Sequence, residues 1–332
     1  MENKFLSSLK FANFFLACLI VFHHAFNIDI SCNSENVMSV AFFVERYMYN
    51  ISECAVPMFY FNSGYLFFRT YKNTIEVYWN KLEKRIFSLL VPYLIFNTLG
   101  YIKHIVFSSE SPSILGFIFS LIESSTMPLW FVRELFILAL LSPIIYFFIK
   151  RRTIFFEVCV GIIILVISNL TSYRSFVYWI PFYAMGGLFA VNKMLDSSFY
   201  ENKILNRVMY ILTFFVLLGA WFLPNGMEKD IYYNSAYYIF RSASVFVILF
   251  LLLKVRSIKI PDLADCSFFI YCTHFPVISL VQRILQYFIK SDSYVLLSYG
   301  ITVICAITIP MALAWYLKTN IKSLWQVLNG GR

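Results

Sequence analysis

Residues 11–26 read FANFFLACLIVFHHAF, an apolar run that is broken only by one asparagine and two histidines. A helix needs about 20 mainly apolar residues to cross the roughly 30 Å hydrocarbon core of a bilayer. Outward from this run, the chain offers further stretches of similar character. We expect ten membrane-spanning helices, at about 11–28, 51–68, 86–107, 127–149, 153–169, 174–192, 206–223, 232–254, 264–288 and 294–317. The apolar segment 113–122 is too short to span and predicts a surface or re-entrant helix.

The composition of the chain points to the same class of protein. Of its 332 residues, 60% are hydrophobic and 14% are charged, against roughly 45–50% and about 25% in soluble domains. A soluble globule cannot cover that much apolar surface, and a disordered chain is far less hydrophobic. Long apolar runs without polar alternation favour helices over a membrane β-barrel. We therefore predict an all-α integral membrane protein, a bundle of about ten transmembrane helices that forms one domain over residues 1–332.

The basic residues predict the topology. The formal net charge is +9, and with a cytoplasmic N-terminus the inner segments hold 19 Lys and Arg residues while the outer segments hold five. Because cytoplasmic loops carry the excess of these residues, we expect both the N- and C-termini to be cytoplasmic. The basic surplus then belongs to one membrane face, which argues against a nucleic-acid partner. Seven cysteines without a CxxC pair and four histidines without ligand spacing indicate no metal site.

Ionisable residues inside the expected spans are candidates for function, because charge at membrane depth is costly. They are His23, His24, Glu53, Arg133, Glu134, Glu157, Arg241, His274 and Arg283. Glu157 follows three basic residues and is typical of a local ion pair. Arg241 and Arg283 are equally compatible with a structural role, bonded to carbonyls or to a neighbouring carboxylate.

The first span places polar groups on one face. At about 100° per residue, Asn13 and His24 lie about 20° apart after three full turns, with an axial separation of about 16 Å. Ala17 lies between them and leaves room along that face for a slender ligand. The adjacent His23 and His24 favour function over a purely structural role.

Several other polar groups share the depth of the two histidines. Glu53 begins the second expected span, and Trp130, Arg133 and Glu134 begin the fourth. A carboxylate beside a histidine would orient its ring and raise its basicity, as a general base near neutral pH requires. The alternative is that Arg133 and Glu134 pair with other groups and anchor the end of their helix.

Five segments of the chain resemble the acyltransferase-3 family, the ten-helix membrane O-acyltransferases that modify bacterial surface polysaccharides. They are His23-His24 at the end of the first span, FYFNSGY at 59–65, KRIFSLLVPY at 84–93, PLWFVREL at 128–135 and SFFIYCTH at 267–274. Each segment alone is a weak signal, but five in the expected order, spread over most of the chain, are a specific one.

The resemblance implies that His24 is the essential histidine and acts as the general base. Together with His23, Glu134 and Glu53 it forms the predicted catalytic group. In the family an arginine stands eleven residues before this histidine, but here that position is Asn13, which carries no charge. We expect Lys10, almost one turn earlier, to compensate in part.

The resemblance also implies acyl-CoA, usually acetyl-CoA, as co-substrate, with no permanently bound cofactor. Lysine and arginine suit the phosphates of coenzyme A, and the basic loop 72–85 could hold them, although topology-setting charge explains the same residues. The predicted donor-binding residues are Asn13, Lys10, Lys81, Lys84 and Arg85. The residues predicted to bind substrate or to stabilise the oxyanion are Ser63, Trp130, Arg133 and His274.

The implied acceptor is a hydroxyl of a glycan or lipid-linked saccharide, and the implied location is the bacterial cytoplasmic (inner) membrane. The acyl group, acetyl or succinyl, stays open, as does the oligomeric state. The alternative function is a polytopic transporter or flippase for a glycan or a small anionic substrate. Midplane charges and possible helix breaks at Pro181, Gly186-Gly187 and Pro310 suit it. No pair of inverted halves is evident, which favours the enzyme.

Overall fold

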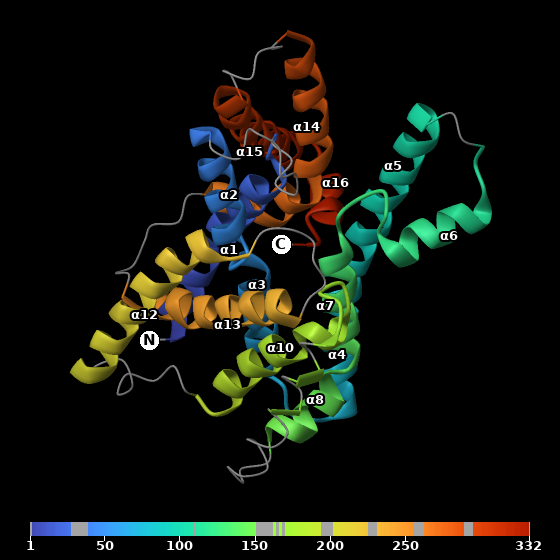
Figure 1. Ribbon diagram of the computed structural model, residues 1–332. Coiled ribbons are helices and arrows are strands. Elements are labelled where there is room, and N and C mark those ends of the chain that lie inside the picture. The colour runs from blue at the N-terminus through green and yellow to red at the C-terminus, as the bar shows by residue number, and fades with distance from the viewer. Residues whose placement is uncertain are drawn as a thin grey trace.

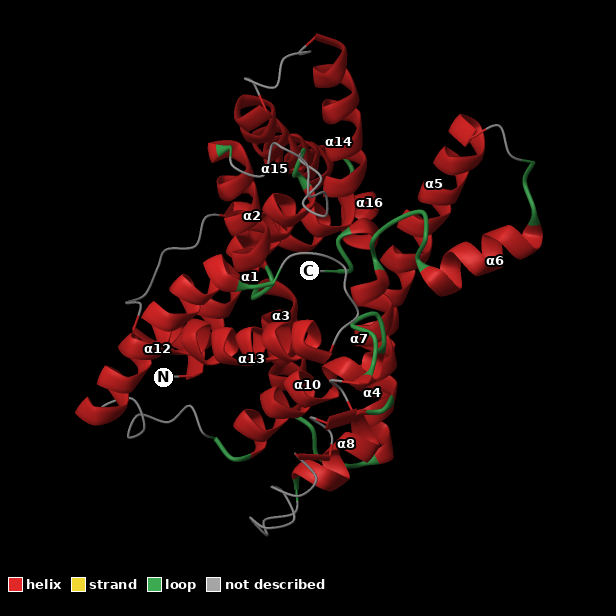
Figure 2. Ribbon diagram, in the orientation of Figure 1, coloured by secondary structure: helices red, strands yellow, loops and turns green. Residues whose placement is uncertain are grey.

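The computed structural model of the chain is helical, with no strand among the residues that it describes (Figure 2). These residues are 2–27, 39–108, 111–150, 162–163, 166–167, 170–193, 202–224, 231–254, 262–288 and 295–331. Within them, six helices are long and apolar enough to cross a membrane, or seven if one bent helix pair counts as a single span. The prediction of an all-helical membrane protein is confirmed at this level.

The elements are, in chain order, α1 (Glu2–His24), α2 (Val40–Ser52), α3 (Ala55–Phe68), α4 (Ile75–Arg85), the π-helical turn η2 (Ile86–Leu90), α5 (Val91–Ser108), α6 (Ile114–Glu123), α7 (Trp130–Leu140), α8 (Ser142–Ile149), α10 (Phe176–Val191), α12 (Lys203–Phe222), α13 (Ile231–Lys254), the 3-10 turn η3 (Asp262–Cys266), α14 (Ser267–Phe288), α15 (Val295–Asn320) and α16 (Lys322–Leu328). Two expected spans, 51–68 and 174–192, appear as the shorter helices α3 and α10. Most of the expected span 153–169 lies outside the described residues.

The first helix is the central element of the bundle. α1 packs against α2, α3, α13, α14 and α15 (Figure 1). Because neighbours surround it, its buried residues do not form a single stripe, and Leu9, Ala12, Leu16 and Val21 are all buried. A helix that is apolar on most of its circumference is typical of such a position.

Two glycines bring α3 and α10 into close contact. A Cβ atom on Gly64 would overlap the backbone carbonyl of Tyr183 on α10, and one on Gly186 would overlap the carbonyl of Phe61 on α3. Small residues at helix crossings permit this approach of two backbones. The Tyr183 hydroxyl also lies 2.9 Å from the Ser142 hydroxyl, which connects α8 to the same crossing. The crossing therefore fixes α3 in the bundle.

The basic segment before the third expected span is helical, so the expectation of a loop there is wrong. The Thr74 side chain caps α4, which continues through η2 into α5 as one helical run from Ile75 to Ser108. The physical reason is that lysine, glutamate, leucine and arginine, which fill residues 81–85, are good helix formers.

The expected span 127–149 is bent, and the short helix expected at 113–122 is present as α6. α7 and α8 differ in direction by 64° at the break between them. Pro143 lies in the first turn of α8, where its missing N–H is tolerated, whereas the same residue would disrupt a continuous helix. The Ser113 side chain caps α6 by accepting a hydrogen bond from the Gly116 N–H at 3.3 Å. α5 and α6 extend together to one side of the bundle (Figure 1).

Candidate active site

Three histidine rings gather where the end of α1 meets α14. The centroid of the His24 ring lies 5.0 Å from that of His23 and 5.3 Å from that of His274. The Nδ1–H of His274 donates to the Tyr271 carbonyl at 2.6 Å. Its Nε2 is buried and has no hydrogen-bond partner among the described residues. A buried polar atom without a partner costs free energy, so this corner of the fold suits a ligand or a proton exchange better than packing alone.

The His23 ring is positioned by α2. Its Nδ1 lies 2.9 Å from the Ser52 hydroxyl oxygen, and the ring stacks on Tyr49 with 4.1 Å between centroids. The Ser52 hydroxyl also donates to the Tyr49 carbonyl at 2.6 Å. The plane of His23 lies nearly perpendicular to that of His24. His23 therefore supports the His24 ring from a fixed position.

The carboxylate of Glu53 pairs with an arginine rather than with a histidine. Its Oε2 accepts hydrogen bonds from Nε of Arg241 at 2.9 Å and from Nη2 at 2.6 Å. Nη1 of Arg241 donates to the Tyr178 hydroxyl at 2.6 Å. The two charged side chains are nearly buried, with exposed fractions of 12% for Glu53 and 10% for Arg241. This is the structural role for Arg241 that the sequence left open.

The carboxylate of Glu134, at the start of α7, also pairs with an arginine rather than with a histidine. Nε of Arg133 donates to Oε1 of Glu134 at 2.7 Å, and Nη2 of Arg133 donates to the Arg174 carbonyl at 3.4 Å. Trp130 lies against Trp179 with 6.1 Å between their ring centroids. These contacts fit the alternative in which Arg133 and Glu134 anchor the helix end.

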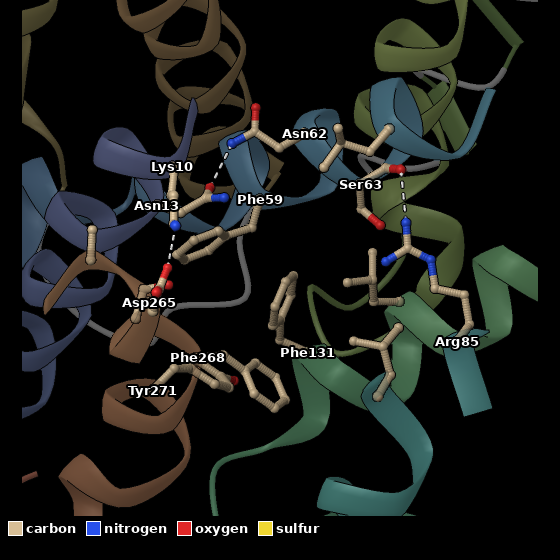
Figure 3. Close-up of a pocket in the computed structure, with 15 residues that line it drawn as sticks. Lys10, Asn13, Phe59, Asn62, Ser63, Arg85, Phe131, Asp265, Phe268 and Tyr271 are labelled. Atoms are coloured by element: carbon tan, nitrogen blue, oxygen red, sulfur yellow. Dashed lines mark hydrogen bonds and ion pairs between the residues drawn. The ribbon is translucent and has the colours of Figure 1, made fainter. Parts of the chain in front are cut away.

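A cavity of about 410 Å³ is lined by three residues predicted to bind the donor and by one predicted for the substrate or the oxyanion (Figure 3). Lys10 and Asn13 come from α1, Ser63 comes from α3 and Arg85 ends α4, and all four line the cavity. Asn62, which also lines it, donates from Nδ2 to Oδ1 of Asn13 at 2.8 Å. A volume of this order admits part of a small-molecule ligand.

The two cations of the cavity lining differ in their partners. Lys10 forms an ion pair with Asp265 of η3, and Asp265 also receives Nζ of Lys318 at 3.2 Å. Nη2 of Arg85 donates to the Ser63 carbonyl at 3.5 Å. Figure 3 shows Lys10 with Asp265 on one side of the cavity and Arg85 with Ser63 on the other.

The other basic residues of 72–85 do not line this cavity. Nζ of Lys81 donates to the Thr70 hydroxyl at 2.8 Å, and the side chains of Lys72 and Lys84 are exposed. Of the basic residues expected there, Arg85 is the one that contributes to the lining.

A line of aromatic rings connects the cavity with His24. Phe131 and Tyr271 both line the cavity, and their ring centroids are 5.6 Å apart. The Tyr271 ring lies 5.8 Å from the His274 ring, which lies 5.3 Å from that of His24. The cavity and the histidines are thus adjacent through α14.

The face of α1 between Asn13 and His24 is packed. Ala17 and Ile20 on that face are only 1% and 4% exposed, and neither lines the cavity. The room expected beside Ala17 is therefore filled by neighbouring side chains. His24 itself does not line the cavity, and the rings of Tyr271 and His274 lie between the cavity and His24.

Three residues of the site were not singled out by sequence reasoning. Asn62 and Tyr271 lie inside segments that carry the family resemblance, and Asp265 lies two residues before another of them. A carboxylate directly before an apolar run was a signal available for Asp265. The pairing of Asp265 with Lys10 is a contact across 255 residues and left no local pattern.

Among the described residues, no three His, Cys, Asp or Glu side chains are placed to hold a metal ion.

Comparison with known families gives a match over nearly the whole chain. A family model described as an acyltransferase domain matches residues 7–317, which include Lys10, Asn13, His24 and His274. No curated protein and no solved structure matches the chain. The matched range ends before α16.

Proposed function

Because the chain belongs to the acyltransferase-3 family and is an acyltransferase, we propose that it transfers an acyl group from acyl-CoA to a hydroxyl of a cell-surface glycan or lipid-linked saccharide. The proposed donor is acetyl-CoA. The proposed location is the bacterial cytoplasmic membrane, crossed ten times, with both termini and the donor on the cytoplasmic side.

The observation that carries the proposal is the contact between His24 and His274. The two rings are 5.3 Å apart, and Nε2 of His274 has no partner among the described residues. A general base must lie within hydrogen-bond reach of the proton that it removes, and it must later release that proton. In the proposal, His274 lies beside this base with its ring in contact with that of His24, while Ser52 and Tyr49 fix His23 on the other side.

In the proposed reaction, His24 removes the proton from the acceptor hydroxyl as the oxygen attacks the thioester carbonyl. The new C–O bond forms and the C–S bond breaks, so the acyl group moves to the acceptor. The proton held by the histidine then passes to the departing thiolate of coenzyme A. Between attack and departure, the carbonyl oxygen carries negative charge that a donor group must stabilise. Ser63, the donor predicted from the sequence, lines the cavity but lies beside Arg85, so its position fits the arm of acyl-CoA better than the oxyanion.

The cavity is the proposed site for the acyl-CoA arm. Asn13 and Asn62 present amide groups that match the amides of pantetheine, and Lys10 and Arg85 present charge to its phosphates. Phe131 and Tyr271 form the apolar wall toward the histidines. In this arrangement, Asn13 need not replace the charge of the family's arginine, because two cations already line the same cavity.

The acceptor is proposed to approach from the start of α7. Trp130 there offers an aromatic surface that is partly buried and lies beside Tyr173, with 5.6 Å between ring centroids. Aromatic faces beside polar side chains suit a saccharide, which presents both C–H surfaces and hydroxyls. Arg133, paired with Glu134, would border this approach.

The test uses purified protein in lipid nanodiscs with labelled acetyl-CoA. The readouts are release of free coenzyme A thiol and transfer of label to a panel of lipid-linked oligosaccharides and polysaccharides. Loss of a general base costs about 10²- to 10⁴-fold in rate, so His24→Ala should lower turnover by that factor while the yield of folded protein stays unchanged.

The matched control is His104→Ala, because His104 lies exposed on α5, outside the cavity and the histidine cluster. This variant should keep the wild-type rate. Wild-type turnover in His24→Ala would remove His24 from the chemistry, and failure of every acyl-CoA to donate label would remove the proposed donor.

A further inference from the structure

The charges in the cavity lining are not those of a simple anion site. Lys10 and Arg85 are the cations of the lining, and Asp265 is its carboxylate. A site that receives the phosphates of coenzyme A gains from positive charge, and a carboxylate within it repels the ligand. The position of Asp265 therefore needs an explanation beyond ligand binding.

Lys10 and Arg85, the two cations, have different kinds of partner. Lys10 is already paired with Asp265. Arg85 donates to the Ser63 carbonyl at 3.5 Å and forms no ion pair with any residue that the structure describes. Arg85 thus has no carboxylate partner among the described residues, whereas Lys10 is covered by the carboxylate of Asp265.

We propose that Asp265 is a built-in competitor of the acyl donor: its carboxylate pairs with Lys10, and a phosphate of the coenzyme A moiety takes its place on Lys10 when the donor binds. The inference rests on the proposed function, because it takes acyl-CoA as the ligand.

Lys318 lowers the free-energy cost of this exchange. Asp265 is shared between Lys10 and Lys318, and Nζ of Lys318 lies 3.2 Å from its Oδ2. When Lys10 turns to the phosphate, the carboxylate keeps Lys318 as a partner. Lys318 does not line the cavity, so the pair that remains does not compete for the ligand.

The exposure of the three side chains fits a pair that opens and closes. The exposed fractions are 51% for Lys10, 25% for Asp265 and 44% for Lys318. Ion pairs with this much access to solvent are weak, because water screens them and two long side chains lose freedom. Asp265 therefore lowers the affinity of the cavity for any anion by a small factor, which favours release of the product coenzyme A.

Asp265→Asn tests the proposal because a competitor and a structural brace predict opposite signs. The measured energies of exposed ion pairs correspond to about a two- to fivefold change in affinity. We expect the KM for acetyl-CoA to fall by about that factor and the inhibition constant of free coenzyme A to fall with it. The KM for the uncharged donor S-acetyl-N-acetylcysteamine should not change. An unchanged or higher KM for acetyl-CoA would overturn the proposal and leave Asp265 as a brace between η3 and α1.

A second variant leaves Asp265 in place. Lys318→Met removes the partner that holds the carboxylate away, so Asp265 should pair more tightly with Lys10 and the KM for acetyl-CoA should rise. The same substitution in the Asp265→Asn background should have no such effect. Equal effects of Lys318→Met in both backgrounds would contradict the competitor role.

Glu83→Gln is the matched control, because Glu83 is an exposed carboxylate on α4 outside the cavity lining. It removes one negative charge without touching Lys10 and should leave the KM for acetyl-CoA unchanged. The failure of this inference is distinguishable from failure of the proposed function: in the first case the wild-type protein uses acetyl-CoA but Asp265→Asn does not lower its KM, and in the second the wild-type protein does not use acyl-CoA at all.

Discussion

The ion pair between Glu53 and Arg241 gives a prediction that separates a structural from a catalytic carboxylate. Both side chains are nearly buried, with 12% and 10% of their surface exposed, so solvent screening is small. Removing one partner of a buried pair costs about 3–5 kcal/mol, because it leaves an uncompensated buried charge. Glu53→Gln keeps an oxygen that can accept from Arg241, so we expect the lower end, about 3 kcal/mol.

The measurement is the unfolding free energy of the protein in detergent, followed by tryptophan fluorescence in a denaturant series. A loss of about 3 kcal/mol lowers the ratio of folded to unfolded protein more than a hundredfold. The double variant Glu53→Gln/Arg241→Met removes both charges, so its destabilisation should be smaller than the sum of the two single losses. The protein that remains folded in Glu53→Gln should keep its turnover number.

The reasoning is refuted if Glu53→Gln unfolds like the wild type and loses turnover. That result would return Glu53 to the catalytic group predicted from the sequence. Additive effects in the double variant would show that the two charges do not stabilise one another.

Two further predictions concern helix packing and the donor site. Gly64→Ala and Gly186→Ala should each destabilise the fold by at least about 1–3 kcal/mol, because the added Cβ meets backbone atoms of the partner helix; Gly219→Ala, where the added Cβ meets nothing within 4 Å, should be harmless in the same unfolding assay. Arg85→Met should raise the KM for acetyl-CoA more than Lys84→Met, since Arg85 lines the cavity and Lys84 is exposed outside it; equal effects would assign the basic residues to topology alone.

The sequence predicted the positions of most helices well, and the errors have identifiable causes. The expected spans 206–223, 232–254 and 294–317 agree with α12, α13 and α15 within about three residues, because uninterrupted apolar runs of that length have few alternatives in a bilayer. The loop expected around Lys84 is a helix, because a count of charges marks the edge of a span and is blind to helix propensity. The bend before Pro143 was available as a proline signal, but its angle depends on packing.

The sequence identified several residues of the candidate site, but it did not predict which of them contact one another. His24 and His274 were both selected from the sequence, and the structure brings their rings to 5.3 Å. Glu53 and Glu134 were expected to lie beside the histidines. In the structure Glu53 pairs with Arg241 and Glu134 pairs with Arg133. The depth of a charged residue in a membrane can be estimated from its place in a span, but its angular position in the bundle cannot, and partner choice depends on both.

The amino-acid sequence by itself determined the helical membrane class, the family and the histidines, because each depends on local composition or on short segments in a fixed order. Only the tertiary structure decided that Lys10, Arg85 and Asp265, from α1, α4 and η3, line one cavity. It also decided that Tyr271 and His274 of α14 join this cavity to His24, whereas the face of α1 beside Ala17 is packed. The reason is physical: whether a helix face is open or filled depends on side chains contributed by distant helices, and no pattern within that face records them.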